Sequence, residues 1–203
     1  MKYIEEFNFM KINIPKCSLE FFNPETNKVL EREIYDYLYK HVFTILFFYP
    51  ADFSAICPTE LQALQKLEKE FKKEKAWILV ISRDSILSHK EWIEQETKLD
   101  NFPHLMATDR DGIILDSLWL LKKKGDFSRT TIIVDTSWSI LSLEIMPYPI
   151  WRNIDELLRK IRSLHHVYEN PEALCPEHWE DSSDSISDWI KKEKKNAPRD
   201  PYQ

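Results

Sequence analysis

An apolar segment that leads through a short loop into an amphipathic helix restricts this chain to a few architectures. Val42–Tyr49 is a run of β-branched and aromatic residues, which predicts a buried strand that ends at Pro50. A helix is predicted from Pro58, because proline suits the first helical position and apolar residues follow at helical spacing. These apolar residues are Leu61, Leu64, Leu67 and Phe71. A strand that passes directly into a helix favours a layered α/β fold.

The rest of the chain first alternates strands with helices and then pairs strands. Trp77–Ser82 predicts a second buried strand, and Ser88–Glu96 predicts a polar helix with Trp92 on one face. Asp109–Leu121 favours a helix with aspartates in its first turn. The later predictions are strands at Thr130–Asp135 and Ser139–Met146, a turn between them at Thr136–Trp138, and an amphipathic helix at Asn153–Ser163. This order of elements predicts an α/β fold with a central mixed sheet flanked by helices.

The chain length fits one domain with a tail. The 203 residues are 43% hydrophobic, which is enough to bury a single core. From Glu169 onward the sequence shows little periodicity. Residues 1–168 are therefore expected to form one domain and residues 169–203 a C-terminal arm.

Charge and apolar patterning exclude several function classes. The net charge of −6 disfavours broad electrostatic binding to nucleic acid or to an anionic membrane. No uninterrupted apolar stretch approaches the length of a membrane span. Met1–Met10 lacks the basic start and apolar core of a secretory signal, so a cytoplasmic location is expected.

The cysteines and glycines narrow the chemistry further. Cys17, Cys57 and Cys175 are an odd and sparse set, which does not resemble a structural disulfide framework. No Cys-x-x-Cys pair is present, and two glycines are too few for a Gly-rich phosphate loop. Asp109–Gly112 lacks the later ligands of a calcium loop, and the spacing of the histidines near Cys175 fits no metal pattern; these are His165, His166 and His178. No metal and no cofactor are expected.

Cys57 is the strongest candidate for a reactive residue. It stands at the start of the predicted helix, where free N–H groups and the helix dipole favour a thiolate. Ser54 lies one turn earlier and could hydrogen-bond an oxygen held at the sulfur, while Pro50 and Phe53 could exclude water. Without this context, a cysteine is more often a small buried apolar residue.

The segment around Cys57 resembles the active-site signature of the peroxiredoxin family. That signature, Pro-x-x-x-Thr/Ser-x-x-Cys, is matched by Pro50, Ser54 and Cys57. The flanking Phe-Tyr-Pro and Cys-Pro-Thr-Glu are shared with the typical 2-Cys subgroup, the alkyl hydroperoxide reductase C and thiol-specific antioxidant type. Three further blocks resemble the family in the same order: Ser88-His89-x-x-Trp92, Phe127-Ser128-Arg129-Thr130 and Glu172-Ala173-Leu174-Cys175-Pro176-x-x-Trp179.

The resemblance implies a thioredoxin-like fold and a role for each matched residue. Cys57 would attack a hydroperoxide and become a sulfenic acid. Arg129 would stabilise the thiolate and the leaving oxygen, and Ser54 would hold the peroxide. Glu60 would orient the arginines. Arg152 would be the family's second active-site arginine, although Trp151 replaces the glycine that usually precedes it. Without the resemblance, Glu60 would be interpreted only as a charge that favours a helix start, and Arg152 as a solvated charge.

The resemblance also implies how the oxidised cysteine is recycled. Cys175 would come from the other subunit of a head-to-tail homodimer and form an intersubunit disulfide with Cys57. Thioredoxin or a similar dithiol donor would then reduce this disulfide. Dimers of this type can assemble to a decamer. Cys17 matches no catalytic position and is interpreted as an incidental thiol.

The chain departs from the family at two places that bear on over-oxidation. Relatives that over-oxidise easily carry Gly-Gly-Leu-Gly where this chain has Lys98-Leu99-Asp100-Asn101, and they end in a tail with a Tyr-Phe pair that Asp200–Gln203 lacks. Resistance of Cys57 to over-oxidation is therefore expected. Two other functions stay open: a Cys–His hydrolase that uses Cys57 with His89, and a redox sensor or holdase.

Overall fold

A single mixed sheet organises the chain. The structure is a computed structural model that describes residues 13–38, 41–121, 129–147, 150–176 and 179. The sheet has the strand order β2-β1-β5-β4-β3-β6-β7. The strands are β1 (Ser18–Asn23), β2 (Lys28–Glu33), β3 (Phe43–Phe48), β4 (Ala76–Ser82), β5 (Leu105–Thr108), β6 (Arg129–Asp135) and β7 (Ile140–Met146). The β3–β4 and β4–β5 pairs are parallel and the others are antiparallel, which confirms the predicted mixed sheet.

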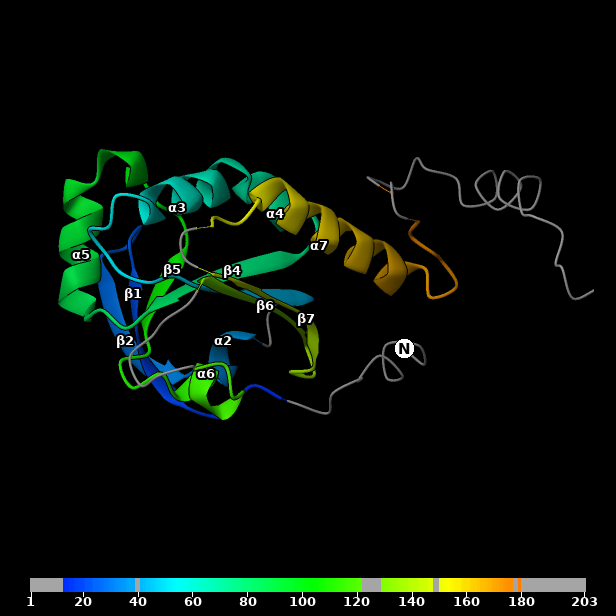
Figure 1. Cartoon of the computed structure of the whole chain (residues 1–203), viewed down its shortest axis with the longest axis horizontal. Helices are drawn as coiled ribbons and strands as arrows, with labels where there is room; N and C mark the ends of the chain where they lie inside the picture. The colour runs from blue at the N-terminus through cyan, green and yellow to red at the C-terminus, as the bar shows by residue number, and fades with distance from the viewer. Residues whose placement is uncertain (1–12, 39–40, 122–128, 148–149, 177–178, 180–203) are drawn as a thin grey trace, which may run out of the picture.

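Helices cover both faces of this sheet. The helices are α2 (Tyr35–Leu38), α3 (Cys57–Lys66), α4 (Glu68–Lys73), α5 (Ile86–Gln95), η1 (Thr97–Leu99), α6 (Ile113–Ser117) and α7 (Ile154–Glu169). In Figure 1, α3, α4 and α7 lie over one face, and α2 and α6 lie against the other. The central strand β3 is buried at all six positions because its side chains alternate between the two apolar layers.

The predicted helices differ from the observed ones in their bounds: α5 begins at Ile86, α7 continues past the predicted end at Ser163 to Glu169, and the other two are interrupted or shortened. The helix expected after Pro58 is interrupted at Leu67 (φ −97°, ψ 7°), so α3 and α4 are separate elements. Within the predicted Asp109–Leu121, α6 is only five residues long. Asp109 accepts hydrogen bonds from the N–H groups of Ile113 and Ile114 (2.8 and 3.1 Å), which starts the helix late, and Trp119 ends it with φ 59°.

The sequence did not predict β1, β2 or β5. All six residues of β2 are exposed, so its sequence Lys-Val-Leu-Glu-Arg-Glu carries no alternation between core and solvent. β5 has only four residues, which is too short for a periodic signal. Among the residues that the structure describes, no helix combines the length and the apolar character needed to cross a membrane.

Candidate active site

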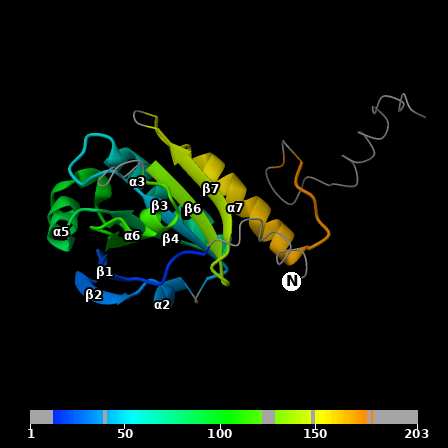
Figure 2. The same ribbon diagram turned by 60° about the horizontal axis from the view of Figure 1, so that its bottom comes forward.

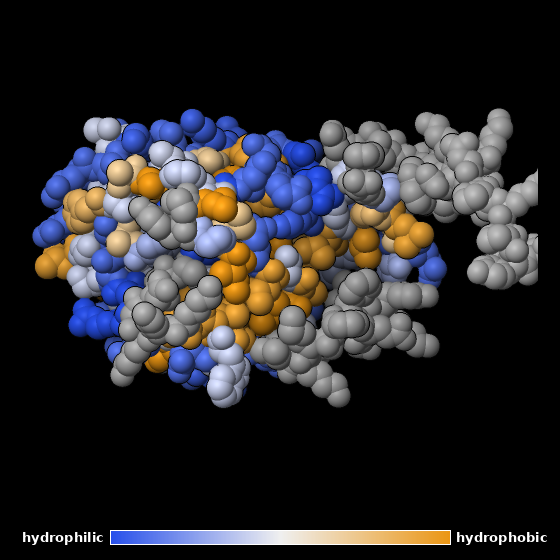
Figure 3. Space-filling model, in the orientation of Figure 1, coloured by the Kyte–Doolittle hydropathy of each residue, from blue (hydrophilic) through white to orange (hydrophobic). Residues whose placement is uncertain are grey.

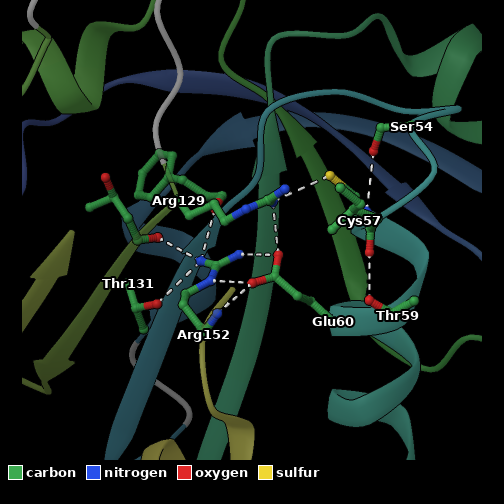
Figure 4. Close-up of polar contacts among 10 residues, drawn as sticks. Ser54, Cys57, Thr59, Glu60, Arg129, Thr131 and Arg152 are labelled. Carbon is green, nitrogen blue, oxygen red and sulfur yellow. Dashed lines mark hydrogen bonds and ion pairs between the residues drawn. The ribbon is translucent and has the colours of Figure 1, made fainter. Parts of the chain in front are cut away.

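Cys57 is the first residue of α3, at the point where the loop after β3 enters the helix. Its side chain is completely buried. The N-cap residue Ile56 has no side-chain cap bond, but the N–H of Cys57 donates to Ser54 Oγ at 3.2 Å. The Thr59 hydroxyl donates to the Ile56 carbonyl at 2.7 Å. Figure 4 shows the sulfur at this helix start, where the dipole of α3 makes the local potential positive.

Ser54 was expected to contact an oxygen held at the sulfur, and in the structure it also binds the start of α3 through a hydrogen bond. Its oxygen accepts the Cys57 N–H and so helps to begin the helix, a role that the sequence analysis did not include. The hydroxyl hydrogen stays available to donate, because a serine hydroxyl can donate and accept together. A single side chain can thus fix the helix start and contact an oxygen atom near the sulfur.

Arg129 approaches Cys57 from the first residue of β6. Its Nη1 atom donates to Cys57 Sγ at 3.5 Å and to Glu60 Oε2 at 2.9 Å. Arg129 is 3% exposed and Glu60 is also 3% exposed, so this ion pair is buried. The helix places Glu60 one turn after Cys57, and the two residues therefore lie on the same side of α3.

Arg152 binds the other side of the same carboxylate. Its Nε donates to Glu60 Oε1 and its Nη2 to Glu60 Oε2, both at 3.1 Å. Its Nη1 donates to the carbonyls of Phe48 and Thr130 and to Thr131 Oγ1, at 2.9, 3.1 and 3.2 Å. Burial lowers the pKa of Arg152, and Glu60 opposes this shift. Arg152 is 6% exposed, so its interpretation as a solvated charge is wrong, as is that of Glu60 as a mere helix-start charge.

These three charged groups leave an excess of positive charge beside the sulfur. Two guanidinium groups share one carboxylate in a buried site. Because charge interactions are stronger in a poorly solvated site, an anion at Cys57 would balance the second guanidinium. The arrangement can therefore bind or generate negative charge at the sulfur, as attack on a peroxide requires.

A second buried network holds the loop that precedes Cys57. Asp52 accepts hydrogen bonds from the hydroxyls of Tyr49 and Ser88, both at 2.7 Å, and its Oδ2 lies 2.8 Å from His89 Nδ1. The Asp52 N–H donates to Asp84 Oδ2 at 2.8 Å. The sequence did not predict this network, although Asp52 and His89 both lie in the segments that resemble the family. It fixes the loop to β4 and α5.

The network also bears on the hydrolase hypothesis. His89 Nδ1 faces Asp52 and the Tyr49 hydroxyl (3.3 Å), and no hydrogen bond joins the described atoms of His89 and Cys57. A cysteine hydrolase needs its base within hydrogen-bond reach of the sulfur. The structure therefore gives no support to a Cys57–His89 pair.

The two residues expected to exclude water differ in burial. Pro50 is half-buried at the end of β3. Phe53 has a positive φ of 53° and is 53% exposed, with its ring 6.4 Å from that of Trp92. In the single chain, about half of Phe53 is therefore in contact with solvent, and it does not seal the loop against water.

The other two cysteines lie away from this site. Cys175 is half-buried beside the last turns of α7, with its Sγ 3.8 Å from the Ser163 carbonyl. In Figures 1 and 2 this segment turns back beside the C-terminal half of α7, whereas α3 begins on the other side of the molecule. Cys17 is also half-buried, and burial together with Asp109 and Glu33 raises its pKa to about 11, so it is a poor nucleophile.

An open groove of about 380 Å³ adjoins the buried ion pairs, between α3 and the start of α7. It is lined by Thr59, Glu60, Ala63, Lys66, Leu67, Trp151, Arg152, Asn153, Ile154 and Asp155. In the described part of the chain, no group of three His, Cys, Asp or Glu residues could hold a metal ion. His178, considered with His165 and His166, lies outside the described residues.

Known proteins of similar sequence and similar fold identify the family. Residues 14–141 match the AhpC/TSA family. The chain is 33% identical over 190 residues to peroxiredoxin prdx-2 of Caenorhabditis elegans, covering 87% of this chain and 94% of the relative. It is 33% identical over 148 residues to alkyl hydroperoxide reductase C of Amphibacillus xylanus, covering 72% and 79%. The crystal structure of reduced Plasmodium vivax 2-Cys peroxiredoxin superposes with a TM-score of 0.76 and 25% identity, covering 83% and 87%, which confirms the thioredoxin-like fold. The chain therefore belongs to the AhpC/TSA family as a typical 2-Cys peroxiredoxin, an enzyme that reduces peroxides with a thiol.

Proposed function

We propose that Cys57 is the peroxidatic residue and that it reduces hydrogen peroxide and organic hydroperoxides. The observation that carries this proposal is the Arg129 guanidinium at 3.5 Å from Cys57 Sγ, at the N-terminus of α3. The Cys57 thiolate attacks the terminal oxygen of the peroxide, the S–O bond forms and the O–O bond breaks. The alkoxide or hydroxide that leaves takes up a proton, and Cys57 remains as a sulfenic acid.

The surrounding residues have separate parts in this reaction. Arg129 stabilises the thiolate and the charge that develops on the leaving oxygen. Ser54 donates its hydroxyl hydrogen to a peroxide oxygen, and Pro50 limits the access of water. Glu60 and Arg152 act as supporting residues, since their shared ion pairs hold Arg129 against the sulfur.

Cys175 of a second subunit completes the cycle through an intersubunit disulfide. Residues 170–176 lie beside α7 and away from the start of α3, which favours the Cys175 of a second subunit over the chain's own. The edge strand β7 offers a surface for the second copy: its residues are half-buried, Ile145 is 42% exposed, and Figure 3 shows hydrophobic side chains over β6 and β7. Residues 1–168 form the peroxidase domain and 169–203 the arm.

The disulfide is recycled by thioredoxin or another dithiol donor, and no further cofactor takes part. Dimers of this kind are suited to assemble into a decamer. A reducing compartment such as the cytosol fits the cycle, because the disulfide between Cys57 and Cys175 must be reduced again after each turnover.

Non-reducing gels and peroxide consumption with a dithiol donor test the proposal together. Peroxide should convert the wild type to a disulfide-linked dimer, and Cys57→Ser should abolish both this band and turnover. Cys175→Ser should abolish the band but keep one rapid oxidation of Cys57, while Cys17→Ser should change neither. Peroxide consumption that survives in Cys57→Ser refutes the assignment. Oxidation without turnover would favour a sensor or holdase over an enzyme.

A further inference from the structure

The segment after α7 folds back onto that helix and brings two of its residues to one helical face. Trp179 is 1% exposed, and its ring lies 5.3 Å from that of His166. Cys175 Sγ lies 3.8 Å from the Ser163 carbonyl. Arg159, Ser163 and His166 are four and three residues apart, so they share this face. We name these five residues the Cys175 seat.

Arg159 is the cation of the Cys175 seat, and two of its three nitrogens are held by one carboxylate. Its Nε donates to Glu156 Oε2 at 2.7 Å and its Nη2 donates to Glu156 Oε1 at 3.0 Å. The remaining Nη1 donates to the Trp179 carbonyl at 3.4 Å. Because a guanidinium is planar and rigid, the pair with Glu156 determines where Nη1 points. Arg159 therefore joins the arm to the helix.

The same cation acts on the thiol of Cys175. Burial raises the pKa of Cys175, and the Ser163 contact and the charge of Arg159 oppose that shift. In turn, Glu156 is the main cause of a raised pKa at Arg159, and the sulfur adds to it. The other titratable residues on this face of α7 and in the described part of the arm are Glu156, His166 and Glu172. Of all these groups, Arg159 is the one permanent cation.

We propose that Arg159 is a positioning residue for the resolving step: it fixes the arm through the Trp179 carbonyl and stabilises the thiolate of Cys175. This inference rests on the proposed function, in which Cys175 attacks the sulfenic acid of Cys57 in the second subunit. The S–S bond forms as the S–O bond breaks. The hydroxide that leaves takes up the proton that the Cys175 thiol released, and water results.

Two variants separate this role from a general effect on stability. Arg159→Gln removes the charge, and Arg159→Lys keeps it while losing the two-point pair with Glu156. Arg162→Gln is the matched control, because Arg162 pairs with Glu70 on α4 (3.0 Å) and has no part in the Cys175 seat. Rapid mixing with hydrogen peroxide measures sulfenic acid formation at Cys57 and the later disulfide formation as separate rates across a pH series.

Arg159→Gln should leave sulfenic acid formation unchanged and slow disulfide formation near neutral pH, because a smaller fraction of Cys175 is then thiolate. The pH profile of disulfide formation should move to higher pH, Arg159→Lys should restore its position, and Arg162→Gln should match the wild type. A slower step with an unmoved profile would mean a structural role only and would overturn the inference, as would unchanged kinetics. Absence of sulfenic acid in the wild type would instead refute the proposed function.

Discussion

Replacing Glu60 with glutamine tests the buried charges that surround Cys57. The Glu60 carboxylate accepts four hydrogen bonds: one from Arg129 Nη1, and three from the main-chain N–H, Nε and Nη2 of Arg152, all between 2.9 and 3.1 Å. Each carboxylate oxygen accepts two of them. In Glu60→Gln one oxygen becomes an NH₂ group, so two N–H donors must face another donor in either orientation of the amide.

The expected loss of stability follows from burial. Glu60 is 3% exposed, and its removal leaves two buried guanidinium groups without a counter-charge. Breaking a buried pair by removing one partner costs about 3–5 kcal/mol. Arg152 keeps its bonds to Phe48, Thr130 and Thr131, whereas Arg129 loses its charged partner. The rate of sulfenic acid formation should then fall by about 100-fold, the effect of a small misplacement at a reacting centre.

Urea unfolding and rapid peroxide mixing measure the two effects separately. The matched control is Glu70→Gln, because Glu70 also pairs with one arginine, Arg162, but its side chain is 43% exposed. That surface pair should contribute less than about 1 kcal/mol. A free energy of unfolding for Glu60→Gln within about 1 kcal/mol of the wild type would refute the reasoning, because two uncompensated buried charges should cost more than that.

Three further predictions concern Arg129, over-oxidation and pH. Arg129→Met keeps the side-chain stem, and it should slow sulfenic acid formation roughly 100- to 1000-fold in stopped-flow measurements without loss of the fold; an unchanged rate would make Arg129 a structural charge only. Under sustained millimolar-range peroxide with donor recycling, mass spectrometry should find most Cys57 recoverable, whereas early accumulation of the sulfinic form would contradict the expected resistance. Burial lowers the pKa of His104 from 6.5 to about 4, so the unfolded chain binds more protons between these values. The free energy of unfolding should therefore fall by about 3 kcal/mol as the pH drops through this window, with no such contribution above it, and His104→Leu should remove this slope in urea titrations at several pH values.

The over-oxidation prediction concerns a segment that the structure describes and a tail that it does not. Leu99, in the segment that lacks the family's glycines, is completely buried in the core. Gln65 Nε2 donates to the Asp100 carbonyl at 2.7 Å, which joins this segment to the third turn of α3. That contact lies two turns after Cys57, so it does not itself hold the first turn of α3 closed. Trp189 and Ile190 could form a different tail clamp with the opposite effect on this prediction, and both lie outside the described residues.

The central part of the fold could be predicted because its signals are local. β3 and β4 are buried on both faces, so their sequences are continuous apolar runs that need no knowledge of their neighbours. Cys57 at the start of α3 was likewise visible, since the strand, the proline and the helical spacing all lie within a short stretch. β2 was missed because every one of its residues is exposed, and its partner β1 alone makes it a strand.

The sequence by itself determined that Cys57 stands between a buried strand and a helix, and the tertiary structure decided which charged groups surround it. Glu60, Arg129 and Arg152 come from α3, β6 and the loop before α7, and no spacing along the chain shows that one carboxylate serves two guanidinium groups. The position of Cys175 against Arg159 and Ser163 also appears only once the arm returns to α7. The physical reason is that periodicity reports the burial of each residue, whereas a buried charge network depends on the distances between segments far apart in sequence.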